Sequence, residues 1–298
     1  MKNKISFFLY IVVVLLGCNS SINAQDLLEK LDTEYPNTPQ YETATFKTTQ
    51  IAIGQSVENR KKGVLQLMAL SRYWNVPNTR TQSFITDRVA TRFGVEYGIT
   101  NNFTTGIGWT SFDNAYNGYF KYNLLRQRKK PSKAFASIAY YQSVSYYGDR
   151  STPSPDSSFN DRLSFTSQLL IARKFTPKFS MQIAPTFIHR NKVAAIDPSN
   201  YFALGFSGRY KVANHVSLVS EYYYVANPIK SKDTYGAFAL GINWDIRYLM
   251  LQFHMTNTWN MIDDDFILNT PNNFNGEDGN FVFGFNAIFT LHFKKNKL

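Results

Sequence analysis

The chain has 298 residues, a formal net charge of +11 and an aromatic content of 16%, with 25 Phe and 19 Tyr. Its mean hydropathy of −0.30 excludes a bundle of membrane helices, because each helix would need about 20 consecutive apolar residues. Many aromatic residues within a polar average are typical of strands that alternate between lipid-facing and lumen-facing side chains.

The N-terminus has the pattern of an export signal, in which Lys2 and Lys4 precede an apolar run over residues 5–16. Two processing sites remain open. We favour cleavage after Ala24, which predicts a signal peptide over residues 1–24, whereas the alternative is lipidation at Cys18 in a lipobox-like sequence. With cleavage after Ala24, the mature chain has no cysteine and a net charge of +9. Because an exported chain rarely meets nucleic acid, we expect no nucleic-acid partner.

Residues 25–63 form a polar N-terminal segment that contains Pro36 and Pro39. Within it, residues 46–54 have some strand character. A strand there would make an odd total, whereas an even number of strands returns both termini to the periplasm. We therefore assign this segment to a periplasmic or luminal position.

From Val64 onward, apolar and polar residues alternate in stretches about as long as tilted membrane strands, about 9–11 residues. Side chains of a strand alternate between its two faces, so each stretch has one apolar face. The predicted fold is all-β, a transmembrane antiparallel up-and-down β-barrel of about 12 strands (range 12–14) over residues 64–298. The expected strands are 64–74, 87–99, 103–112, 118–127, 134–146, 162–174, 179–189, 201–211, 215–225, 235–244, 248–259 and 281–293. Pro185 cannot donate to a ladder, and we expect a bulge there.

The last expected strand, 281–293, carries the clearest pattern. Phe281, Phe283, Phe285 and Phe289 alternate with small or polar residues such as Gly284. A dense aromatic face suits contact with lipid and is typical of the closing strand of an outer-membrane barrel. The expected localisation is therefore the bacterial outer membrane.

Connections of two lengths alternate along the chain. Short, turn-rich connections at 100–102, 176–178, 213–214 and 245–246 are separated by long segments such as 147–161 and 260–280. Short turns at one rim and long loops at the other predict short periplasmic turns and long extracellular loops.

Several motifs resemble an uncharacterised, porin-like family of outer-membrane β-barrels from Gram-negative bacteria. They are the run Gly54-Gln55-Ser56-Val57-Glu58-Asn59 with Lys61-Lys62-Gly63-Val64-Leu65, the run Arg92 to Thr100, and Gly118-Tyr119-Phe120-Lys121-Tyr122. The resemblance covers most of the mature chain. It implies fold and location, and it carries no catalytic residue.

The face assignment places a set of polar residues inside the barrel. A positive lining would favour anions, so the leading hypothesis is a narrow porin-like channel for small anionic solutes. The alternative is a packed interior of ion pairs in a non-conducting structural or docking barrel that binds a periplasmic or surface partner. The pore-lining candidates are Arg72, Arg88, Arg92, Glu96, Lys121, Arg162, Arg209, Glu221 and His254.

Charge also differs between the two rims, with basic residues at the short-turn end and acidic residues at the long-loop end. The default explanation is that both rims are charged surfaces in contact with water. A basic periplasmic rim could also hold anionic lipid headgroups or an acidic protein partner. The expected partners are thus outer-membrane lipid, a small solute and a periplasmic protein, and the oligomeric state stays open.

The last long loop is rich in oxygen ligands, which Ca²⁺ prefers, although a solvated loop is the default. The metal candidates are Asp263, Asp264, Asp265, Glu277 and Asp278.

A third function, lipid modification, would use His254 with Thr256 and Asn260, as in a His, Ser and Asn catalytic set. A Thr in place of Ser, facing the lumen, argues against it. We therefore predict no enzyme and no cofactor.

Overall fold

The computed structural model describes residues 40–75, 86–129, 134–149, 157–274 and 281–292. The expected signal peptide, Cys18 and the site after Ala24 lie outside the described residues. None of the described helices is long and apolar enough to cross a membrane.

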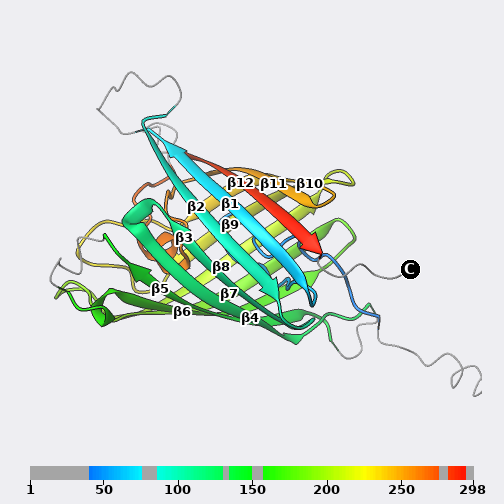
Figure 1. Cartoon of the computed structure of the whole chain (residues 1–298), viewed down its shortest axis with the longest axis horizontal. Helices are drawn as coiled ribbons and strands as arrows, with labels where there is room; N and C mark the ends of the chain where they lie inside the picture. Colours follow the sequence, from blue (N-terminus) through cyan, green and yellow to red (C-terminus); the bar gives the residue numbers. More distant parts are fainter. Residues whose placement is uncertain (1–39, 76–85, 130–133, 150–156, 275–280, 293–298) are drawn as a thin grey trace, which may run out of the picture. The chain divides into compact units, whose positions relative to one another are not determined.

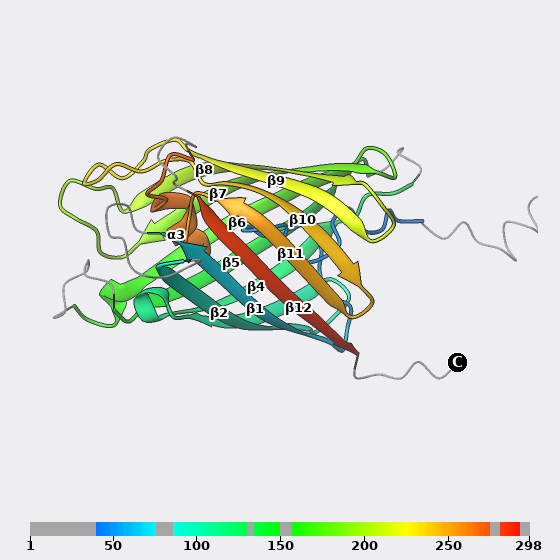
Figure 2. The same cartoon turned by 90° about the horizontal axis from the view of Figure 1, so that it is seen from above.

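Twelve antiparallel strands close into a barrel, as predicted (Figures 1 and 2). Each strand pairs with its neighbours in sequence, and β1 closes on β12 through ten residue pairs from Val64–His292 to Tyr73–Phe283. The strands are β1 Val64–Trp74, β2 Arg88–Gly98, β3 Phe103–Thr110, β4 Ala115–Leu125, β5 Ser137–Tyr147, β6 Leu163–Lys174, β7 Phe179–Arg190, β8 Asn200–Lys211, β9 Val216–Val225, β10 Phe238–Ile246, β11 Leu249–Thr256 and β12 Val282–His292.

Alternating faces sort the side chains as the sequence predicted. On β2, Phe93 and Val95 are exposed on the outer wall, with 54% and 39% of their surface accessible, whereas Arg92 and Glu96 are buried inside. The cause is the bilayer, since an Arg or Lys on the lipid face would cost about 2–4 kcal/mol near the midplane.

Tight turns connect β6 to β7, β8 to β9 and β10 to β11, at the end where β1 begins and β12 ends. By the pattern of outer-membrane barrels we assign this end to the periplasm and call the opposite end the outer rim. One expectation was wrong, because β7 keeps the same register with β8 on both sides of Pro185 and forms no bulge there. The recorded shift in register lies instead between Asn123 and Leu125 on β4.

A stretch before β1, residues 44–58, lies inside the barrel, and we call it the lumen segment. Its residues 45–57 are buried except for partly buried Lys47. It folds back on itself through a bridge between Gln50 and Gln55, with the N–H of Ile51 donating to the carbonyl of Gly54 at 2.9 Å. The expected strand-like stretch 46–54 therefore occupies the lumen and pairs with no barrel strand among the described residues.

From the opposite rim, the connection between β11 and β12 folds inward and carries the short helix α3, Asp263–Leu268 (Figure 2). All six residues of α3 are buried, and the ring of Phe266 packs against Tyr223 on β9 at 5.1 Å. A solvated loop was expected here, so this expectation was wrong for the described part of the loop. Two segments thus fill the barrel from its two ends.

Candidate functional site: the occupied lumen

The lumen segment is held by charged wall residues that bind its backbone. The carboxylate of Glu221 on β9 accepts hydrogen bonds from three consecutive N–H groups, those of Ala52 at 2.6 Å, Ile53 at 2.8 Å and Gly54 at 3.1 Å. A carboxylate that accepts several N–H groups forms strong, charge-assisted hydrogen bonds. Glu221 therefore fixes the turn of the lumen segment to the wall.

Lys121 on β4 binds the same segment as a hydrogen-bond donor, whereas Glu221 is an acceptor. Its Nζ donates to the carbonyl oxygens of Ser56 at 2.8 Å, Thr49 at 3.1 Å and Glu58 at 3.3 Å. The side chain has no measurable exposure. A buried ammonium that is paired with several carbonyl oxygens avoids most of the penalty for burying a charge.

Arg209 and a group of wall amides complete the contacts. Arg209 on β8 donates to the carbonyls of Ala44 at 3.0 Å and Thr45 at 3.3 Å. Gln182 bonds to the lumen segment twice, accepting from the N–H of Val57 at 2.8 Å and donating to the carbonyl of Gln55 at 2.7 Å. Asn243, Gln252 and Asn286 donate to the carbonyls of Ile51 or Ala52. The wall thus recognises the backbone of the segment more than its side chains.

A second group of inward charges is bonded mainly within the wall. Arg72 donates to Asn286 Oδ1 at 2.9 Å, and Tyr119 donates to Glu96 at 3.0 Å. Glu96 also lies 3.8 Å from Arg60, which follows the lumen segment. Arg92 is buried beside Gly108, where an added Cβ would lie 2.5 Å from its Nη2.

His254 lies on β11 directly between two glycines of the neighbouring strands. It pairs with Gly241 on β10 and Gly284 on β12, and an added Cβ on Gly284 would lie 2.0 Å from its Nε2. The hydroxyl of Thr256 donates to the carbonyl of Phe238 at 2.6 Å, and no described contact joins it to His254. A nucleophile needs a base within reach, so the geometry gives the lipid-modifying hypothesis no support.

Two of the pore-lining candidates lie at the outer rim and not among the buried residues of the lumen. Arg88 is exposed at the first position of β2. Arg162 ends the 3-10 turn Asn160–Arg162 in an outer loop, where it donates to the carbonyls of Tyr147 and Gly148, so β6 begins one residue later than expected. The other seven candidates are buried on inward positions, and their role in conduction stays a prediction.

The three aspartates of α3 bind wall side chains near the outer rim. Tyr141 donates to Asp263 at 2.6 Å, Tyr147 donates to Asp264 at 2.6 Å, and Arg190 lies 3.1 Å from Asp264 and 3.5 Å from Asp265. Burial raises the pKa of Asp263, and the hydrogen bond from Tyr141 offsets part of this rise.

The described part of this loop does not support a calcium site. Among the described residues, no three His, Cys, Asp or Glu side chains gather closely enough to hold a metal ion. Asp263, Asp264 and Asp265 accept hydrogen bonds or ion pairs from the wall. Glu277 and Asp278 lie outside the described residues.

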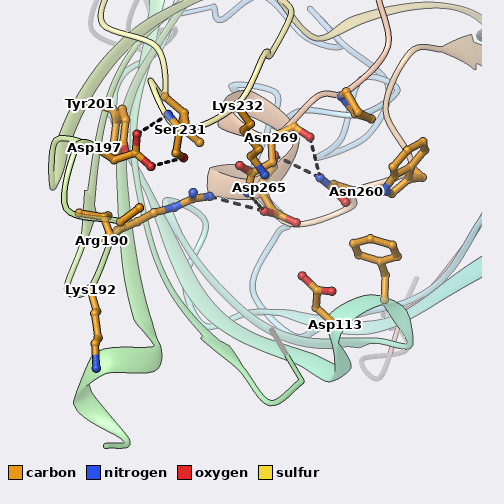
Figure 3. Close-up of a pocket in the computed structure, with 16 residues that line it drawn as sticks. Asp113, Arg190, Lys192, Asp197, Tyr201, Ser231, Lys232, Asn260, Asp265 and Asn269 are labelled. Carbon is orange, nitrogen blue, oxygen red and sulfur yellow. Dashed lines mark hydrogen bonds and ion pairs between the residues drawn. The ribbon is translucent and has the colours of Figure 1, made fainter. Parts of the chain in front are cut away.

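A cavity of about 490 Å³ remains at the outer mouth, between α3 and the loops that surround it. Figure 3 shows Arg190 bonded to Asp265, and Asp197 bonded to Ser231, with Asn260 and Asn269 beside α3. Phe112, Tyr201 and Trp259 also line this cavity. We call it the mouth cavity.

Sequence reasoning found the charged wall residues but not what they bind. The partners of Glu221 and Lys121 are backbone groups more than 60 positions away. Backbone groups are the same at every residue, so no sequence motif identifies which of them a side chain will bind. Gly54 was a usable signal, because an added Cβ at this position would collide with Tyr223 and Glu221 of the wall.

Comparisons with known proteins gave distant structural neighbours and one family match. Among curated proteins, no sequence matches the chain. Similar folds occur in the NanC porin (10% identity, TM-score 0.47, 78% of this chain and 100% of that chain) and in the KdgM porin in complex with disordered oligogalacturonate (8%, 0.48, 77% and 99%). An outer membrane channel from Pseudomonas putida F1 is also similar, with 11% identity, a TM-score of 0.45, and coverage of 79% of this chain and 98% of that chain.

Residues 46–291 match the family described as membrane bound beta barrel domain (DUF5777), a span that includes most of the lumen segment and nearly the whole barrel wall. The chain therefore belongs to this family of membrane-bound β-barrels.

Proposed function

We propose that the protein is a gated porin-like channel of the outer membrane, which passes small anionic solutes when the lumen segment leaves the barrel. The observation that carries this proposal is how the segment is attached. Side chains of the wall hold it by hydrogen bonds, whereas the ladder of twelve strands closes without it. Its departure would remove one of the two segments that fill the lumen and leave the wall intact, with α3 still narrowing the outer end.

The charge of the wall supports an anionic solute. The buried, inward charged residues of the wall candidates are four cations and two carboxylates, namely Arg72, Arg92, Lys121 and Arg209 against Glu96 and Glu221. With the segment absent, Lys121 and Arg209 lose their carbonyl partners and face the passage. A positive lining favours anions by the same physics as a charged selectivity ring.

A second candidate function is a non-conducting barrel that docks a partner. The observation that favours it is that α3 also fills part of the lumen. Tyr141, Tyr147 and Arg190 hold α3 independently of the lumen segment. A barrel filled from both ends resembles a packed scaffold more than a resting pore. The two candidates differ in whether the segment can move.

The deciding experiment locks the segment in place. Thr49 Oγ1 lies 3.3 Å from Gln66 Oε1 on β1, so a Thr49→Cys and Gln66→Cys pair in a Cys18→Ser background can be joined by a short thiol crosslinker. We expect anion-selective openings in planar bilayers under a salt gradient, lost on crosslinking and regained when a cleavable linker is reduced. Silence of the inserted, unlinked protein, even with wall contacts to the segment removed, would favour the docking barrel.

A further inference from the structure

The mouth cavity is built by four outer connections of the barrel, together with Arg190 and Tyr201 at the outer ends of β7 and β8. Its lining comes from the turn between β3 and β4, the β7–β8 and β9–β10 connections, and the connection that carries α3. A volume of about 490 Å³ lies within the usual range for small-molecule sites, about 300–1,000 Å³.

Charged groups in this cavity largely satisfy one another. Arg190 pairs with Asp265 and with the neighbouring Asp264, and Asp197 accepts hydrogen bonds from Ser231 and from the N–H of Lys230. The lining holds the carboxylates of Asp113, Asp197 and Asp265 and the cations of Arg190, Lys192 and Lys232, of which Lys192 pairs with Asp161 outside the lining. In Figure 3, Lys192 points away from the other labelled side chains. The lining therefore has no excess of positive charge that would favour an anionic ligand.

Two amide oxygens in the lining have unused acceptor capacity. Asn260 is only 3% exposed, and its Nδ2 donates to the carbonyls of Asp265 and Asn269, but its Oδ1 has no partner among the described residues. The Oδ1 of Asn269 is buried and unpartnered in the same way. Buried polar atoms are normally hydrogen-bonded, so we expect each of these two acceptors to receive an O–H or N–H donor.

Aromatic side chains complete the lining. Trp259 packs on Trp74 and near Phe112, with ring centroids 5.2 and 6.3 Å apart, and Trp259, Phe112 and Tyr201 all border the cavity. Tyr201 is only 1% exposed, so the apolar surface with fixed geometry beside the polar acceptors comes from Trp259 and Phe112. A sugar ring has this combination of features, since it presents apolar C–H faces and hydroxyl donors without charge.

We propose that the mouth cavity binds a neutral saccharide unit, with ring hydroxyls donating to Asn260 Oδ1 and Asn269 Oδ1 and a ring face against the aromatic group. This site lies on the outer side of α3 and does not depend on movement of the lumen segment. It holds equally for a channel and for a docking barrel.

The test uses the full folded protein in a detergent without a sugar headgroup, such as an amine oxide. Isothermal titration with maltose, cellobiose, lactose and N,N′-diacetylchitobiose is compared with glucuronic acid and inorganic phosphate. We expect saturable binding of at least one neutral disaccharide. Ala194→Trp, which fills the cavity from its own lining, weakens that binding at least tenfold.

The matched control is Ala213→Trp, at an exposed tight turn on the opposite rim, which leaves binding unchanged. Asn269→Ala, which removes one free acceptor, is a second variant that should also weaken binding. Each variant is shown to be folded by electrophoresis, in which the unheated barrel migrates faster than the heated, unfolded protein. No saturable neutral saccharide, binding of the charged probes alone, or equal effects of the two tryptophans would overturn the proposal.

Discussion

Gly54 in the lumen segment and Glu221 on β9 are in direct contact, because the N–H of Gly54 lies 3.1 and 3.4 Å from the two carboxylate oxygens. A Cβ on Gly54 would lie 2.7 Å from Glu221 Oε2 and 1.8 Å from the hydroxyl of Tyr223. At position 54, therefore, the segment fits against the wall only because the residue has no side chain.

We expect Gly54→Ala to displace the lumen segment while the barrel stays folded. The clash involves the buried side chains of Glu221 and Tyr223, and overpacking of this kind costs about 1–3 kcal/mol. The measurement is the rate of tryptic cleavage after Lys47 in detergent-solubilised protein. Gly208→Ala is the control, since an added Cβ there meets nothing within 4 Å. Equal cleavage of the two variants would contradict the predicted fit.

Glu221→Ala should release the segment more completely than Glu221→Gln. Alanine leaves the N–H groups of Ala52, Ile53 and Gly54 without their acceptor, and each hydrogen bond to a charged group contributes about 1.5–3 kcal/mol. Glutamine keeps one acceptor oxygen and so keeps part of the contact. If the segment is the gate, mean current in planar bilayers rises in the order wild type, Gln, Ala. The reverse order would count against attachment through this carboxylate.

The sequence was sufficient to predict the wall of the barrel. Period-two alternation is a local property, so β1 begins and ends where predicted, and the aromatic face that includes Phe283 and Phe289 lies on the outside of β12. Tight turns such as 176–178 were equally readable, because turn residues act over a few positions.

The sequence was not sufficient for the contents of the lumen. Three consecutive aspartates were predicted to lie in a solvated loop, whereas their burial depends on contacts with Tyr141 and Tyr147 of β5 and Arg190 of β7. Likewise, the residues that hold the lumen segment are separated from it by up to 234 positions along the chain. Only the closed barrel brings such groups together.

Arg190→Met should loosen α3 from the outer rim. Asp264 has no exposed side-chain surface, and removing one partner of a buried ion pair costs about 3–5 kcal/mol. Hydrogen exchange of the α3 amides, followed by mass spectrometry, should be faster in this variant. Lys192→Met is the control, because its pair with Asp161 is exposed to solvent, which screens the interaction. Unchanged exchange in the Arg190 variant would show that α3 docks without this clamp.

The contact between Asp197 and the β9–β10 connection should weaken in acid. Burial alone would raise the pKa of Asp197, but the hydrogen bonds from Ser231 Oγ and from the N–H groups of Lys230 and Ser231 outweigh it and bring the pKa below its ordinary value of 3.8. A carboxyl whose folded-state pKa is lowered contributes stability above the unfolded value and loses it as pH falls through the folded value.

We therefore expect Asp197→Asn to lower the free energy of unfolding at pH 7 and to have progressively less effect below pH 3.8. Urea unfolding of both proteins in detergent between pH 2.5 and 7 measures this difference. Asp149→Asn, on another outer loop, controls for the general loss of a negative charge. A difference that stays constant down to pH 2.5 would mean that the charge of Asp197 does not hold the two loops together.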